Sequence, residues 1–158
     1  MNGTKRKLKR RNTEAGMTLL ELIIACSILI VLASAALPVA RYSIVRSKEV
    51  ELRRDLREMK DAIDRYKDAA DKNLIRVEVG SEGYPPDLET LVTGVDVAGK
   101  KLKFLRKIPI DPMTGQAEWG MRSMQDDATS DSWGGQNVFD VYSKSQGTAL
   151  DDSKYKDW

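Results

Sequence analysis

The hydrophobic and polar positions divide the chain into a basic start, a long apolar run and a mixed remainder. Six Lys and Arg residues, against the single acid Glu14, precede the run. The 24 residues from Met17 to Ala40 then contain only one charged side chain, Glu21. A helix of this length rises about 36 Å, enough to cross a hydrocarbon core of about 30 Å. The pattern predicts one membrane span, with the basic end in the cytoplasm and the rest of the chain on the opposite side.

A cleaved secretory signal peptide is the alternative interpretation of this segment. Ala33-Ser34-Ala35 has the small residues of a signal peptidase site. The apolar stretch before Ala33 is already 16 residues long, however, and it includes Glu21. An apolar core of a secretory signal is typically about 7–15 residues, so a retained span is favoured.

Beyond Pro38 the pattern becomes that of an amphipathic helix. Apolar residues recur at helical steps, which predicts one buried face: Val45, Leu52, Leu56, Met59, Ile63, Tyr66 and Ala70. Opposite charges four residues apart predict ion pairs along the exposed face: Glu49/Arg53, Arg54/Glu58, Arg57/Asp61, Asp61/Arg65 and Asp68/Lys72. We therefore expect a single helix from Met17 to Lys72, stopped at Asn73. A coiled coil is the alternative for its second half, but packing on the protein's own small domain is favoured.

The remaining residues, 74–158, predict a small domain that mixes helix and strand. Asp87 is placed to cap a short helix over Leu88–Val92. Short strands are expected at Ala117–Ser123 and at Val138–Ser143. In the second of these, successive side chains alternate between two faces of the strand, as is typical of a strand with one buried face. The acidic stretch Gln125 to Asn137 between them is too polar for the core. The fold class expected is α+β.

Charge and composition remove several classes of function. The whole chain carries 26 Lys and Arg against 24 Asp and Glu, but without residues 1–16 the acids outnumber the bases by three. A net negative chain gives no electrostatic support for nucleic-acid binding. There is no histidine, no glycine-rich phosphate loop and no nucleophile elbow, so we expect no enzyme. Cys26 is the only cysteine and cannot form an intrachain disulfide.

Gly16 followed by Met17-Thr18-Leu19-Leu20-Glu21 resembles the class III signal of type IV pilins and type II secretion pseudopilins. The resemblance implies that a prepilin peptidase removes residues 1–16, cutting between Gly16 and Met17, and methylates the new amino group of Met17. The family usually has phenylalanine at that position, so methionine is a departure. Glu21 is then expected to form a salt bridge with the Met17 amine of a neighbouring subunit, because two opposite charges in an apolar bundle are stable only together.

Motifs in the second half resemble the major pseudopilin of type II secretion, the G subunit. They are turn formers and strand residues: Tyr84-Pro85, Phe104-Leu105, Ile108-Pro109, Asp111-Pro112 and Phe139–Ser143. The resemblance implies a long helix (17–40 in the membrane or fibre core, 41–73 periplasmic) packed against a small antiparallel sheet in a head formed by 74–158. Pro38 is expected either to kink this helix, as in the family, or to mark the end of the span.

The same resemblance implies a calcium ion in the last loop, with no other cofactor expected. Asp151 and Asp152 are the candidate ligands, together with backbone oxygens of 143–147. The loop departs from the family because Lys154 occupies the place of a second spaced aspartate. A solvated acidic turn is the alternative.

The function that the resemblance implies is that of a structural subunit of the type II secretion pseudopilus. Such a subunit polymerises through its N-terminal helix and drives protein export across the outer membrane. Its expected partners are other copies of itself, minor pseudopilins, the prepilin peptidase and the inner-membrane assembly platform. We expect it in the bacterial inner membrane, with a cytoplasmic N-terminus and a periplasmic head. The alternative is a type IV pilus subunit for adhesion, motility or DNA uptake, although true pilins usually carry a C-terminal disulfide.

Overall fold

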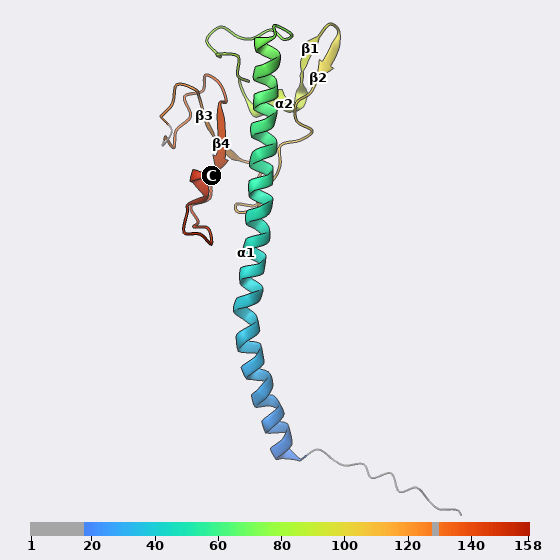
Figure 1. Ribbon diagram of the computed structural model, residues 1–158, viewed down its shortest axis with the longest axis vertical. Helices are drawn as coiled ribbons and strands as arrows, with labels where there is room; N and C mark the ends of the chain where they lie inside the picture. The colour runs from blue at the N-terminus through green and yellow to red at the C-terminus, as the bar shows by residue number, and fades with distance from the viewer. Residues whose placement is uncertain (1–17, 128–129) are drawn as a thin grey trace, which may run out of the picture. The chain divides into compact units, whose positions relative to one another are not determined.

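The computed structural model describes residues 18–127 and 130–158. Helix α1 (Leu19–Asp71) is followed by α2 (Leu88–Thr93), four short strands and a final 3₁₀ turn, η1 (Tyr155–Asp157) (Figure 1). The strands are β1 (Val95–Val97), β2 (Lys100–Leu102), β3 (Trp119–Arg122) and β4 (Asp140–Ser143). The chain divides into two compact units between Arg41 and Tyr42, and the second unit contains all elements after α1. The α+β class predicted from the sequence is confirmed.

Helix α1 agrees closely with the single helix predicted for Met17 to Lys72. It ends where the sequence places the stop. Asn73 has a positive φ of 54°, and the amide of Leu74 donates to the carbonyl of Ala69 at 2.9 Å. This is the left-handed closure that asparagine tolerates at the C-terminus of a helix.

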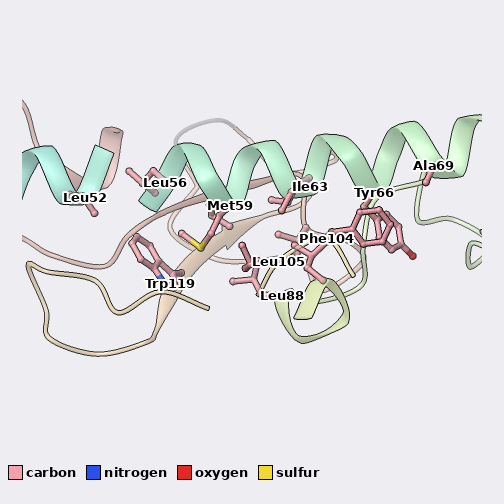
Figure 2. Close-up of a cluster of buried hydrophobic side chains, with 14 of the residues drawn as sticks. Leu52, Leu56, Met59, Ile63, Tyr66, Ala69, Leu88, Phe104, Leu105 and Trp119 are labelled. Atoms are coloured by element: carbon pink, nitrogen blue, oxygen red, sulfur yellow. The ribbon is translucent and has the colours of Figure 1, made fainter. Parts of the chain in front are cut away.

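The second half of α1 buries its apolar face against the protein's own head (Figure 2). Leu52, Met59 and Ile63 are essentially inaccessible to solvent. They share one cluster with side chains from the rest of the head: Leu88, Leu91, Phe104, Leu105, Trp119, Val138 and Val141. The predicted packing on the small domain is therefore confirmed, because the face that would form a coiled-coil seam is covered by the same chain.

Strands β3 and β4 form an antiparallel pair within the two segments predicted from the sequence, each shorter than expected. Gly120 lies opposite Tyr142 in the register. A Cβ at Gly120 would overlap the Tyr142 ring, so the ring occupies the space that a side chain would need. The guanidinium carbon of Arg122 lies 4.1 Å from the centre of the same ring.

The hairpin of β1 and β2 was not predicted. Val97 pairs with Lys100, and the two residues between them, Ala98 and Gly99, both have positive φ, of 49° and 81°. Such a two-residue turn is usually signalled by Asn-Gly or Asp-Gly, and alanine is an uncommon residue in this conformation. The strand that follows is entirely exposed, so its sequence lacks an alternating pattern.

Helix α2 begins as predicted. Asp87 is its N-cap, and the Asp87 carboxylate accepts hydrogen bonds from the amide and the hydroxyl of Thr90 at 2.7 and 2.6 Å. The bond from the Thr90 amide satisfies a backbone donor that the first turn of the helix cannot pair internally. The helix extends to Thr93, one residue further than expected.

Two predictions for the polar positions are wrong in part: in the part of the chain that the structure describes, four of the expected ion pairs do not form, and the polar stretch 125–137 is buried at one residue, Asn137. Within the described residues, only one of the five ion pairs expected along α1 forms, Asp68–Lys72 at 2.9 Å. Glu49 and Arg53 contact the C-terminal segment instead, because the folded chain offers them partners that the helix alone cannot.

The loop before β4 also enters the core at its end. Asn137 is fully buried, and its side-chain oxygen accepts from the amide of Met124 at 3.0 Å.

Candidate processing and assembly segment

The first turn of α1 is closed by Thr18, a residue to which the sequence expectations gave no role. The Thr18 hydroxyl accepts a hydrogen bond from the amide of Glu21 at 3.2 Å. Threonine followed three residues later by glutamate is the capping-box pattern, and this signal was available in the sequence. A carboxylate in the first turn is also stabilised by the helix dipole. Glu21 therefore has a local role in the subunit alone, in addition to any role between subunits.

The large apolar side chains that the structure describes between residues 19 and 34 are exposed. Eight large ones are between 51 and 69% accessible: Leu22, Ile23, Ile24, Ile28, Leu29, Ile30, Val31 and Leu32. The most apolar 18-residue window has a mean hydropathy of 2.7, and none of that window is buried in the molecule. The helix is long and apolar enough to cross a membrane. An exposed apolar surface of this extent needs lipid or other chains to cover it.

The polar groups within this segment are largely satisfied by the helix itself. The hydroxyls of Ser27 and Ser34 each donate to a backbone carbonyl of the preceding turn at 2.7 Å, Ser27 to Ile23 and Ser34 to Val31. A hydroxyl paired in this way is compatible with an apolar environment. Cys26 is exposed on the same segment and has a free thiol.

Pro38 lies inside α1, and the helix continues on both sides of it. Proline cannot donate to the carbonyl four residues earlier, which here belongs to Ser34. A kink at Pro38 stays a prediction.

The processing site itself lies outside the described residues. Gly16 and Met17, where cleavage and methylation are expected, belong to that part of the chain, as does the basic leader 1–16. Glu21 is described and lies exposed in the first turn of α1. The salt bridge between Glu21 and the Met17 amine is expected between subunits, so a single chain does not test it.

Comparison with known protein families adds one finding to this geometry. Residues 11–37 match the family model described as the prokaryotic N-terminal methylation motif. The chain carries the prepilin signal of type IV pilin-like proteins. The matched range contains Gly16, Met17 and Glu21, together with most of the exposed apolar segment. Neither the comparison with curated proteins nor that with solved structures finds a match.

The methylation motif indicates a type IV pilin-like subunit, of either a pilus or a secretion pseudopilus. It implies processing by a prepilin peptidase and assembly into a fibre in association with a membrane. The apolar first half of α1 is consistent with a membrane anchor.

The two candidate calcium ligands lie near the end of the chain. Asp151 Oδ1 accepts from the amide and the hydroxyl of Ser153 at 3.1 and 2.5 Å, and Asp151 Oδ2 accepts from Arg53 at 3.2 Å. The hydrogen bonds from Ser153, reinforced by the charge of Arg53, hold the pKa of Asp151 below its usual value. Asp152 is exposed and has a positive φ of 64°.

This arrangement does not fit a calcium site. Calcium takes six to eight oxygen ligands, whereas both oxygens of Asp151 already bind protein donors and one of these donors is a cation. Among residues 18–127 and 130–158, no group of three or more His, Cys, Asp or Glu residues is placed to hold a metal ion.

Proposed function

We propose that this protein is a structural subunit of a type II secretion pseudopilus. In this proposal the subunit is held in the bacterial inner membrane by the first half of α1, with its N-terminus in the cytoplasm and its head in the periplasm. After cleavage at Gly16 it polymerises through that helix, and the growing fibre drives protein export across the outer membrane. The role is mechanical, and no catalytic activity is proposed.

One observation carries the proposal. The methylation motif at residues 11–37 overlaps an apolar segment of α1 whose large described side chains lie exposed. In the membrane, lipid covers such a surface. In a fibre, the same surface of neighbouring copies covers it. Glu21 is placed in the first turn, where the amine created at Met17 of another copy can pair with it.

A type IV pilus subunit is the second candidate, since the methylation motif is common to both classes. The cysteine content favours the pseudopilus. True pilins usually close their C-terminal region with a disulfide, whereas this chain has a single cysteine, Cys26, which lies in the apolar segment of α1. The proposed partners are other copies of this chain, minor pseudopilins, a prepilin peptidase and an inner-membrane assembly platform.

Deletion of the gene in the source bacterium tests the proposal. We expect proteins normally found in the culture medium to accumulate in the periplasm, while surface pili and surface motility stay unchanged. Expression of the wild-type chain from a plasmid should restore secretion. Normal secretion combined with loss of surface pili would contradict the pseudopilus assignment and support the pilus.

A further inference from the structure

The C-terminal segment 147–158 is attached to α1 through the buried carboxylate of Glu49. From sequence spacing, this residue is expected only to form an ion pair with Arg53 within the helix. Glu49 is only 9% exposed. Its Oε1 accepts two hydrogen bonds from the end of the chain, from the amide of Leu150 at 2.8 Å and from the hydroxyl of Tyr155 at 3.1 Å. The two donors are 101 and 106 residues from Glu49 in the sequence, so these bonds close a long loop.

A second attachment lies one helical turn further along α1. The Arg53 guanidinium donates to Asp151 Oδ2 at 3.2 Å, and its central carbon lies 4.0 Å from the centre of the Trp158 ring. Trp158 is fixed in turn by its ring nitrogen, which donates to the Ser153 hydroxyl at 2.7 Å. The rings of Tyr155 and Trp158 meet edge to face, with their centres 5.2 Å apart. Arg53 thus contacts the segment by charge and by stacking.

The segment is also closed on itself. Thr148 and Lys154 form an antiparallel bridge, and the amide of Ala149 donates to the carbonyl of Ser153 at 2.8 Å. In the turn between Thr148 and Lys154, Asp151 Oδ1 accepts hydrogen bonds from the amide and the hydroxyl of Ser153. Within the described residues, no buried side-chain nitrogen or oxygen atom lacks a hydrogen-bond partner.

We propose that Glu49 and Arg53 fasten the C-terminal segment to α1 and so replace the calcium ion that the family resemblance implies. We call the two α1 residues, with Leu150, Asp151, Tyr155 and Trp158, the C-terminal clasp. The clasp uses both Asp151 oxygens for protein donors, and its guanidinium lies where it would repel a second cation. The head therefore keeps its C-terminal segment in place without a metal ion. This inference concerns the head alone and does not depend on the proposed function.

The test uses the full mature chain in detergent micelles and two readouts. Thermal unfolding is measured in excess calcium and in excess chelator, and hydrogen–deuterium exchange is followed for peptides from 147–158 and from α2. For the wild-type chain we expect the same Tm, and the same protection of 147–158, in both solutions. A Tm that rises with calcium, or added protection of 147–158 by calcium, overturns the proposal.

Variants at Glu49 test the attachment itself. Glu49→Ala removes the acceptor from two donors, and we expect the Tm to fall by about 5–10 °C and exchange in 147–158 to rise, with α2 less affected. Glu49→Gln keeps an oxygen at the same place and should retain most of the protection, which keeps the proposal testable if the alanine variant does not fold. Asp64→Ala, at an exposed acid of the same helix, is the matched control. Unchanged protection of 147–158 in Glu49→Ala, or complete loss of that protection in Glu49→Gln, overturns the proposal.

Discussion

Glu21 has two separable roles at the scale of single residues. In one chain its carboxylate lies in the first turn of α1, where the helix dipole favours a negative charge, next to the cap that Thr18 provides to the Glu21 amide at 3.2 Å. In a fibre, its carboxylate is proposed to pair with the new amine of Met17 on a neighbouring copy. The first role contributes only to the helix end. The second neutralises two charges in apolar surroundings, where removing one partner typically costs about 3–5 kcal/mol.

A pair of substitutions separates these roles. We expect Glu21→Ala to be cleaved normally at Gly16 but to form no fibres, because the Met17 amine is left unpaired. Thr18→Ala removes the cap and keeps the charge, so it should still assemble, with a helix destabilised by about 0.5–2 kcal/mol. Cleavage is followed by gel mobility, and assembly by electron microscopy of sheared fractions. Normal fibres from Glu21→Ala would exclude the intersubunit pair, and an equal defect in Thr18→Ala would assign the effect to the helix end.

At the scale of the element, the features of α1 that could be predicted are those that have a local signal in the sequence. Its buried face follows from helical periodicity, and its end follows from Asn73, because both signals are local. The caps of α1 and α2 are equally local. The hairpin of β1 and β2 carries no such signal, since its turn is Ala98-Gly99 and β2 is exposed. Its existence depends on the rest of the head.

The partners of Glu49 and Arg53 illustrate the same limit. Spacing of four residues favours an ion pair between them, worth only about 0.2–0.5 kcal/mol on an exposed helix. A backbone amide and a tyrosine hydroxyl from the C-terminal segment bind Glu49 instead. No local rule identifies donors about a hundred residues away. For this reason the linear motif at Gly16, Met17 and Glu21 could be read from sequence, whereas the C-terminal clasp could not.

The buried face of α1 also contains an acid, Asp55. Burial of its charged carboxylate lowers the stability of the folded state by an amount that depends on pH. Burial raises the pKa of Asp55, and repulsion from Glu51, Glu58 and Asp111 adds to this, while Arg54 opposes it. Because the pKa is raised in the folded state, the neutral carboxyl favours folding below the ordinary value of 3.8, and this contribution is lost as the pH rises through the folded pKa.

Asp55→Asn therefore should stabilise the head at neutral pH. We expect the Tm to rise by about 2–4 °C at pH 7 and the gain to vanish as the pH approaches about 4. Asp64→Asn, at an exposed acid of α1, should leave the Tm unchanged. A lower Tm for Asp55→Asn at pH 7 would mean that the carboxylate has a stabilising partner and that its burial carries no net cost.

At the scale of the whole molecule, the two compact units of the chain differ in how far their apolar side chains are covered. The second unit, which begins at Tyr42 and includes the head, buries a core of apolar side chains and contains the C-terminal clasp. The first half of α1 leaves its large described apolar side chains exposed and contains most of the methylation motif. This difference between the units agrees with the proposed function, in which a membrane covers the first half of α1 before assembly and neighbouring copies cover it afterwards.

The mass of the mature chain and the identity of its first residue decide whether the subunit is processed as a pilin-like protein. The protein is extracted from membranes and analysed by intact and N-terminal mass spectrometry. We expect a chain that starts at Met17 and carries one added methyl group on its amine. A chain that starts near Ala36, as a secretory signal peptidase would leave it, or one that retains residues 1–16, would contradict pilin-like processing.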